Sequence, residues 1–432
     1  MTQNSGTIVI MVKKYFTIAV GKSFKKVAAL RGGGSALPGL VVEKIDPDFL
    51  RHILSTLPMG VVIISGTNGK TTTTKIVTEL LEANGVKVFT NRTGSNFPRG
   101  VAAALLGEID MRGKLNADIA VLELDEAWAV RFIEKVQPRY SLLLNVMRDQ
   151  LDRFAEIDKT AKLLEKVALA TTDSVVINQD DFRLQAIAAK LTAKTVFYGM
   201  SEQTKHLIAS SDQIDSIQEE DTPHQNSVLL KDFTDNEVHF TIGEKTYTTS
   251  PSLKGVYNLQ NAAAALSLTK EILETNDIQY SDGALVETLG TIQPAFGRGE
   301  TVSVNGTPVT LLLVKNPKGF QLALNLAGDR DSVMIAINDN FADGRDMSWL
   351  WDVDFSRLKT VTVTSGVRAY DMALRLGYDN IATSSIEPEL EKALHTLLAT
   401  NPKQPKLIYC TYTAMLSIRK ILSTKTELEH IS

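Results

Sequence analysis

The 432-residue chain has one cysteine, Cys410, and only six histidines. One cysteine excludes a disulfide framework and a zinc site built from several cysteines, so we expect a reducing, cytoplasmic location and no zinc. A net charge of −4 gives no sign of a nucleic-acid-binding surface. No apolar run approaches the ~20 residues needed to cross a bilayer. Hydrophobic residues still make up 44% of the chain, enough for substantial cores in two or three domains.

A glycine-rich turn ending in Lys-Thr lies between an expected buried strand, Val61–Ile64, and an expected helix that stops at Asn84-Gly85. In this order, backbone N–H groups face a polyphosphate, Lys70 neutralises its oxygens and Thr71 can hold Mg²⁺. A glycine turn without a nucleotide is the weaker alternative. The residues predicted to surround the phosphates are Gly66, Thr67, Asn68, Gly69, Lys70, Thr71 and Thr72.

Short apolar runs alternate with helical patterns from Val61 to about Tyr198, which is typical of a parallel sheet covered by helices. A polar, acidic stretch at 201–226 precedes three segments expected to be antiparallel strands. These are Val228–Leu230, Glu237–Ile242 and Lys245–Thr249. Beyond Thr301, strands and helices alternate again, which predicts a second α/β domain.

We therefore expect three parts. Residues 1–55 form a basic N-terminal helix and a glycine-rich loop, and residues 56–300 form a nucleotide-binding domain in which 201–249 is a polar insertion with small antiparallel strands. Residues 301–432 form the smaller α/β domain. The basic helix, 12–31, is expected to pack on the body of the protein, the alternative being contact with an anionic membrane surface. Met11 is a second plausible start.

Polar residues follow several expected strands, where ligands of open α/β sheets gather. Glu123 is placed to bind Mg²⁺ opposite Thr71, although an ordinary acidic loop is the alternative. The charged run 145–153 is equally compatible with nucleotide or metal contact and with salt bridges at a helix entry. Asn258 and Asn261 suit a purine or ribose, or helix capping, and Arg298 suits a phosphate at the domain boundary.

The second domain carries an acidic run after the expected strand Ser332–Ile337. Asp339, Asp343 and Asp346 are followed by Trp349 and Trp351, which favours a structured or interfacial surface over a solvated loop. No histidine lies near this run in the sequence. A histidine-based catalytic triad contained within this chain is therefore not expected.

The loop Gly66–Thr72 resembles the phosphate loop of the Mur ligase superfamily, which includes folylpolyglutamate and cyanophycin synthetases. Asn258, Asn261 and Arg298 resemble its later nucleotide motifs. A closer resemblance is to the MurT family. Typical Mur ligases carry a histidine in the segment where Gln150 stands here, and Asp-x-x-His-Asn-Pro where this chain has Lys315-Asn316-Pro317. These differences favour the MurT branch over an amino-acid-adding ligase. The MurT-like segments are Leu37–Gly39, Thr93–Asn96, Arg148–Phe154, Lys315–Pro317, Asn338–Trp349, Arg368–Tyr370 and Leu374–Leu376.

This resemblance implies a Mur-ligase-like central P-loop domain with a parallel sheet and a smaller, Rossmann-like C-terminal α/β domain. It implies ATP and Mg²⁺ as ligands and Lys70 as a catalytic residue. The implied reaction phosphorylates the α-carboxylate of D-glutamate in the lipid II stem peptide and amidates it to D-isoglutamine. The implied partner is a GatD-type glutaminase that forms a heterodimer and supplies ammonia, with Asp346 completing its triad by orienting its histidine.

Many MurT proteins carry a four-cysteine zinc ribbon in the central domain, but this chain has no cysteine there. His206 and His224 do not make a tetrahedral site by themselves. Two other functions stay open at this stage. One is a Mur-type amino-acid ligase such as a folylpolyglutamate synthetase, and the other is an inactive nucleotide-binding scaffold.

Overall fold

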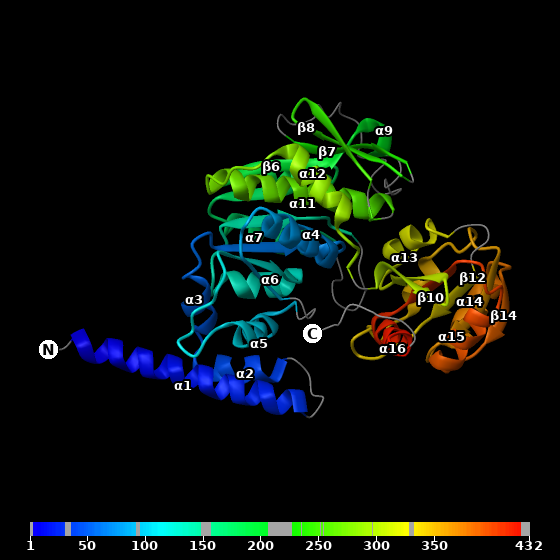
Figure 1. The fold of residues 1–432 in the computed structure, drawn as a ribbon, viewed down its shortest axis with the longest axis horizontal. Helices are drawn as coiled ribbons and strands as arrows, with labels where there is room; N and C mark the ends of the chain where they lie inside the picture. Colours follow the sequence, from blue (N-terminus) through cyan, green and yellow to red (C-terminus); the bar gives the residue numbers. More distant parts are fainter. Residues whose placement is uncertain are drawn as a thin grey trace.

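A computed structural model describes residues 3–30, 36–91, 96–147, 157–205, 227–234, 236–250, 252–253, 255–295, 297–327 and 332–424. Two sheets, each covered by helices, stand beside one another, and the N-terminal helices lie along the edge of the larger unit (Figure 1). The predicted charged run beyond Met147, most of the polar stretch 201–226 with His206 and His224, and the glycines at 32–34 lie outside the described residues.

The larger sheet has the strand order β2-β3-β1-β4-β5-β6-β7-β8-β9. Its strands are β1 (Val61–Ser65), β2 (Val88–Thr90), β3 (Ile119–Glu123), β4 (Tyr140–Leu143), β5 (Ser174–Asn178), β6 (Lys194–Met200), β7 (Val228–Phe233), β8 (Val238–Ile242) and β9 (Lys245–Thr249). The pairs from β2 to β7 are parallel, which confirms the predicted parallel sheet.

The prediction that Val228–Leu230 belongs to a small antiparallel group is wrong for one of the two neighbours of this strand. β7 pairs antiparallel with β8 but parallel with β6, so β7, β8 and β9 extend the main sheet. The long connection after β6 allows this, because a parallel pair needs a crossover of a dozen or more residues.

Alternate residues of β1 face two different cores, since side chains along a strand point to opposite faces. Val62 and Ile64 pack with α4 (Lys70–Ala83), α11 (Val256–Thr275) and α12 (Asp282–Thr291). Val61 and Ile63 pack with the helices of the other face. Those are α3 (Phe49–Leu54), α5 (Pro98–Glu108), α6 (Glu126–Ile133) and α7 (Ile157–Leu169). α8 (Phe182–Ala188) packs on β5, and the short α9 (Glu202–Lys205) lies against β6 and β7.

The basic N-terminal segment is a helix, α1 (Gln3–Leu30), that packs on α2 (Ala36–Ile45) and α5. The contact is close, because a Cβ added at Gly21 would lie 2.6 Å from Val42 and 2.7 Å from Leu106. The predicted loop at 31–39 is helical from Ala36 onward. Pro38 lies in the first turn of α2, where a missing N–H costs little.

The second sheet has the order β10-β11-β15-β12-β13-β14, parallel except for the β10–β11 hairpin. Its strands are β10 (Arg298–Val304), β11 (Thr307–Leu313), β12 (Ser332–Ala336), β13 (Thr360–Ser365), β14 (Ala382–Ile386) and β15 (Lys406–Cys410). α13 (Pro317–Leu324), the 3₁₀ helix η1 (Ser348–Asp352) and α14 (Ala369–Tyr378) cover one face, and α15 (Leu390–Ala399) and α16 (Tyr412–Leu422) cover the other. The sheet begins at Arg298, before the predicted boundary at Thr301.

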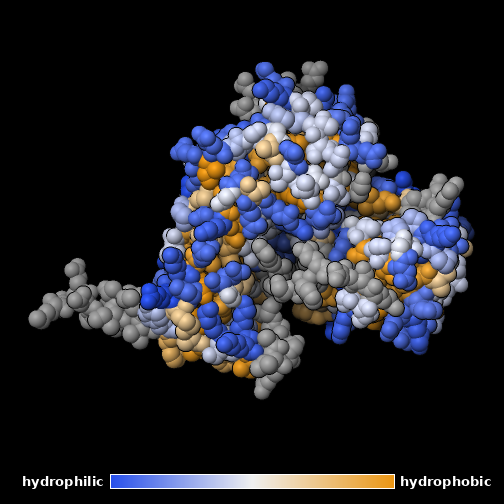
Figure 2. Space-filling view, viewed as in Figure 1, coloured by the Kyte–Doolittle hydropathy of each residue, from blue (hydrophilic) through white to orange (hydrophobic). Residues whose placement is uncertain are grey.

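The described helices include none with the length and apolar character needed to cross a membrane. On the face shown in Figure 2, hydrophilic residues are spread over both units, and hydrophobic residues are interspersed among them.

Candidate active site

The turn between β1 and α4 has a backbone that only glycine accommodates at two positions. Gly66 (φ +136°) and Gly69 (φ +91°) both adopt positive φ. A Cβ at Gly66 would lie 2.9 Å from the Asn145 amide nitrogen, and one at Gly69 would lie 2.4 Å from Asn261 Oδ1. The chain is thus held close to its neighbours and turns directly into the N-terminus of α4, an arrangement suited to a polyphosphate.

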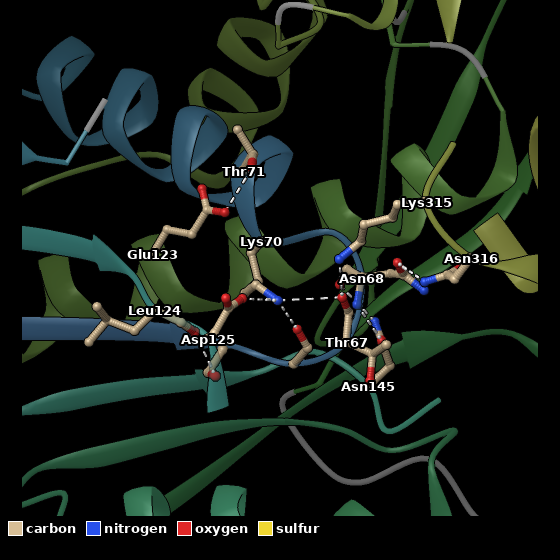
Figure 3. Close-up of polar contacts among 12 residues, drawn as sticks. Thr67, Asn68, Lys70, Thr71, Glu123, Leu124, Asp125, Asn145, Lys315 and Asn316 are labelled. Atoms are coloured by element: carbon tan, nitrogen blue, oxygen red, sulfur yellow. Dashed lines mark hydrogen bonds and ion pairs between the residues drawn. The ribbon is translucent and has the colours of Figure 1, made fainter. Parts of the chain in front are cut away.

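Asn145, in the loop after β4, supports this turn (Figure 3). Its side-chain oxygen accepts a bond from the Asn68 amide at 3.0 Å, and its side-chain nitrogen donates to the Asn68 carbonyl at 3.0 Å. Its own carbonyl accepts from the Thr67 amide at 3.1 Å. For Asn145, the structure thus shows a contact with the phosphate loop itself. Sequence analysis had left the run 145–153 open between ligand contact and salt bridges.

Lys70 is almost fully buried, with 5% of its surface exposed. Its Nζ donates to the Gly66 carbonyl at 2.6 Å and to the Thr67 carbonyl at 3.4 Å, and it forms an ion pair with Asp125 Oδ1 at 3.1 Å. Asp125 precedes α6, but its side chain makes no capping bond there. Sequence analysis assigned Asp125 no role, although its position two residues beyond Glu123 at a strand end was a usable signal.

Thr71 and Glu123 meet as expected from their positions. The Thr71 hydroxyl donates to Glu123 Oε1 at 2.9 Å, and Glu123 is 8% exposed. Two bonds with the Asn91 side chain hold the Glu123 backbone, at 2.8 and 3.0 Å. No group of three or more metal-ligating side chains occurs in the part of the chain that the structure describes. One hydroxyl and one carboxylate nevertheless fit Mg²⁺, which usually keeps several waters and takes further ligands from the nucleotide.

The remaining predicted nucleotide residues approach from other elements. Asn261, on α11, is buried against Gly69. Asn258 lies in the first turn of the same helix, where its amide donates to the Gly255 carbonyl at 3.0 Å. Arg298 is half-buried, and its burial lowers the pKa of its guanidinium while the negative charge of Glu123 opposes this shift. Arg298 therefore brings a cation of the second unit towards the Thr71–Glu123 pair.

Two further residues of the second unit reach the phosphate loop across the boundary (Figure 3). Lys315 Nζ donates to the Thr67 carbonyl at 3.3 Å, and Asn316 Nδ2 donates to Asn68 Oδ1 at 3.1 Å. From the sequence, Lys315 is only a difference from amino-acid-adding Mur ligases, and no contact with the phosphate loop is predicted for either residue. No local pattern identifies such a contact, because the partners are 248 residues apart.

Asp346 is apart from this group. It is exposed on the loop after β12, and its contact given by the structure is with Ser348, whose amide donates to Asp346 Oδ1 at 2.9 Å. Hydrogen bonds from Ser348 hold the pKa of the Asp346 carboxyl below its ordinary value, so this carboxylate is ionised at neutral pH.

In the comparisons with known proteins, separate family models match the two units of the chain. The model described as Mur ligase middle domain matches residues 64–269, and the model described as MurT ligase C-terminal matches residues 313–415. The MurT subunit of lipid II isoglutaminyl synthase (glutamine-hydrolyzing) from Streptococcus pneumoniae R6 is 28% identical over 96% of this chain and 98% of its own. The chain belongs to the MurT family of the Mur ligase superfamily. The corresponding subunit from Staphylococcus aureus COL is 28% identical over 84% of this chain and 88% of its own.

Solved structures show the same fold. MurF from Acinetobacter baumannii superposes with a TM-score of 0.65 at 17% identity, covering 89% of this chain and 81% of its own. MurF from Thermotoga maritima, in complex with ADP, gives 0.64 at 16% identity, covering 90% of this chain and 84% of its own. The predicted Mur-ligase fold of this MurT family member is thereby confirmed.

Proposed function

We propose that the chain is the ATP-dependent synthetase subunit of a lipid II isoglutaminyl synthase. It phosphorylates the α-carboxylate of the D-glutamate in the stem peptide and amidates it to D-isoglutamine. The observation that carries this proposal is the phosphate loop, with Lys70 and the Thr71–Glu123 pair in place, in a chain related to MurT subunits over nearly its whole length. The Mur ligase fold supports the class of reaction, an ATP-dependent carbon–nitrogen ligation.

The chemistry requires activation because a carboxylate is a poor electrophile. A carboxylate oxygen attacks the terminal phosphorus of ATP, the bond to the bridging oxygen breaks and ADP leaves. Ammonia then attacks the acyl carbon, loses a proton, and phosphate departs with the electron pair of the broken C–O bond. Protein groups contribute chiefly by positioning and by stabilising charge that develops in transfer. Mg²⁺, held by Thr71 and Glu123, would supply further positive charge to the phosphates.

Lys70 is already directed into the turn, where it binds two carbonyls and Asp125. A nucleotide phosphate would replace the Asp125 carboxylate as its anionic partner. Gly66, Thr67, Asn68, Gly69 and Thr72 complete the cradle, Asn258 and Asn261 would contact the nucleoside, and Arg298 would approach the phosphates from the second unit.

The second unit offers a surface for a GatD-type glutaminase that supplies the ammonia. Asp346 is ionised and exposed, as a residue that orients a partner's histidine must be. Large apolar side chains exposed on the same unit are typical of protein interfaces. They are Phe341, Trp351, Val367, Tyr370, Leu374 and Tyr378, with Trp351 and Tyr378 in edge-to-face contact at 5.2 Å.

The experiment measures amidation of lipid II by mass spectrometry with ATP and Mg²⁺, using either ammonium chloride or glutamine plus the glutaminase. The unaltered chain should amidate with ammonium alone. Asp346→Asn should retain this reaction and lose the glutamine-driven one. Asp354→Asn is a matched control, because Asp354 is also exposed and accepts a backbone bond, from Ser356 at 2.9 Å. Amino-acid adducts in place of the amide, or no turnover with ammonium, would refute the proposal.

Its lipid-linked substrate would place the protein at the cytoplasmic surface of the membrane. α1 contains five lysines and no acidic residue, and Phe16 (60%), Phe24 and Val27 are exposed on it. Basic helices with exposed aromatic residues bind anionic lipid surfaces. Phe16→Ser should therefore weaken co-sedimentation with anionic vesicles, whereas Leu169→Ser, which alters an exposed apolar residue of α7, should not.

A further inference from the structure

The loop that carries Asp346 is fastened at its base by a buried carboxylate. Asp343 is 5% exposed. Its Oδ1 accepts the Thr413 amide at 2.7 Å, and its Oδ2 accepts the Thr413 hydroxyl at 2.6 Å and the Asn340 amide at 3.1 Å. Hydrogen bonds to a charged acceptor are stronger than neutral ones, so Asp343 attaches the loop firmly to Thr413.

The Thr413 hydroxyl is the centre of the arrangement. It donates to Asp343 and accepts bonds from the side-chain amides of Asn338 at 3.0 Å and Asn340 at 2.8 Å. A hydroxyl has one proton and two lone pairs, and all three are used here. We name these four residues, Asn338, Asn340, Asp343 and Thr413, the loop clamp.

The clamp ties the loop to a rigid element. Thr413 lies in the first turn of α16, which is anchored by buried Ala414, Met415 and Ile418. Gly344, with φ +85°, follows Asp343 in a conformation that favours glycine, and the loop continues from it to the exposed Asp346. Burying a carboxylate costs stability, since apolar residues of similar size often stabilise a fold equally well or better. What the clamp adds is a fixed loop geometry.

We propose that Asp343, acting through Thr413, positions the loop that presents Asp346 to the glutaminase. This rests on the proposed function, because it concerns the coupling of that same reaction to its ammonia source. Asp343 does not touch substrate in this account and acts through the geometry of Asp346. Loosening the clamp lowers the glutamine-driven rate and leaves the synthetase chemistry at the phosphate loop unchanged.

The test uses the complete complex of the chain with its glutaminase. Thr413→Val removes the hydroxyl at constant volume, Asp343→Asn removes the charge, and Thr413→Ser restores the hydroxyl. Ser417→Ala is the matched control, because Ser417 is on the same helix and its hydroxyl donates to the Thr413 carbonyl, at 3.0 Å, and not to the clamp side chains. Glutamate release and lipid II amidation are measured with the partner at saturation, and ammonium-driven amidation is measured alongside.

We expect Thr413→Val and Asp343→Asn to lower kcat for glutamine-driven amidation by about tenfold or more, as for the loss of a buried, charge-assisted hydrogen bond. Ammonium-driven amidation should stay within about twofold of its rate in the unaltered chain. Loss of one such bond would cause a larger change. Thr413→Ser and Ser417→Ala should behave as the unaltered chain does. An effect that vanishes at higher partner concentration would be a binding effect and would overturn the proposal.

Unchanged glutamine-driven rates in both variants, or an equal loss of both reactions, would also overturn it. The proposed function has a separate test within the same experiment. If the unaltered chain fails to amidate lipid II with ammonium, the proposed function itself is wrong, whatever the variants do.

Discussion

Asp125→Asn tests whether the Asp125 carboxylate competes with a nucleotide phosphate for the Lys70 ammonium. The Lys70 ammonium is paired with Asp125 at 3.1 Å, in the place where a phosphate would compete for it. A nucleotide must therefore displace the carboxylate, and it must also tolerate a second negative charge nearby. The asparagine side chain keeps the volume but removes the charge. We expect it to tighten the binding of ADP measured without Mg²⁺.

The size of the effect follows from the geometry. A hydrogen bond to a charged group contributes about 1.5–3 kcal/mol net in a buried setting. The Asp125 side chain is 22% exposed, so partial screening by solvent places this pair at about 1–2 kcal/mol. Because about 1.4 kcal/mol changes a dissociation constant tenfold, ADP should bind about five- to thirty-fold more tightly.

Calorimetric titration of ADP in EDTA measures this directly. Asp173→Asn is a matched control, because it removes a carboxylate from a comparable ion pair, Arg139–Asp173 at 2.6 Å, that precedes β5 at the opposite end of the sheet. The control should leave the dissociation constant of ADP unchanged. Thermal unfolding without nucleotide should show a small loss of stability in the Asp125 variant, since its native ion pair is gone.

Unchanged or weaker ADP binding by the Asp125 variant in EDTA would refute the competition argument. A variant that binds ADP normally in EDTA and no longer gains affinity from Mg²⁺ would assign Asp125 to the metal instead.

Three other outcomes are expected. Lys70→Ala should lower amidation by about 10²–10³-fold with ammonium as well as with glutamine, because charge stabilisation in the transition state is lost; equal loss in both mass-spectrometric assays is the check. Glu123→Gln should abolish the gain in ADP affinity that Mg²⁺ gives, measured by titrating Mg²⁺. Burial raises the pKa of Asp180 to about 7 from 3.8, so between these values the folded chain holds a proton that the unfolded chain has lost. Stability then falls as the pH rises through this window, and Asp180→Asn should raise Tm at pH 8 more than at pH 5 in thermal unfolding scans.

The parts of the fold that sequence predicts well are those with strong local signals. β1, the glycine turn and α4 follow one another within a short segment, and Gly85, with φ +81°, is at the predicted end of the helix. Buried parallel strands such as β3 and β5 are continuous apolar runs, which periodicity identifies directly.

The two edge strands of the second sheet, β10 and β14, give the weakest signals in the sequence. β14 has alternately exposed, small polar residues, and β10 contains Gly299 and an irregular register, so neither shows an apolar run. The helical start of α2 was obscured by Pro38 and Gly39, which usually signal a loop. Gly39 is required by packing, because a Cβ there would lie 1.9 Å from the Arg99 carbonyl oxygen.

Within the site, the sequence predicts residues by their position at strand ends, and it predicts one pair of neighbours, Thr71 and Glu123. The Thr71–Glu123 contact joins residues 52 apart, and it is expected because Glu123 stands at the carboxyl end of a strand, where ligands of such sheets gather. The Asn145, Lys315 and Asn316 contacts with the phosphate loop depend on how separate loops and units come together. No pattern within one segment contains that information.

One helix, α16, supports elements used in both halves of the proposed reaction, the synthetase step and the supply of ammonia from glutamine. Glu300, two residues from Arg298 on β10, forms a bidentate ion pair with Arg419 of α16 at 2.7 and 2.8 Å. The opposite end of α16 holds the loop clamp through Thr413. α16 thus supports both the strand that brings Arg298 towards Glu123 and the loop that presents Asp346. A change that moves the whole helix, such as loss of the Glu300–Arg419 pair, should therefore affect ammonium- and glutamine-driven amidation together, whereas a change confined to Thr413 should affect only the second.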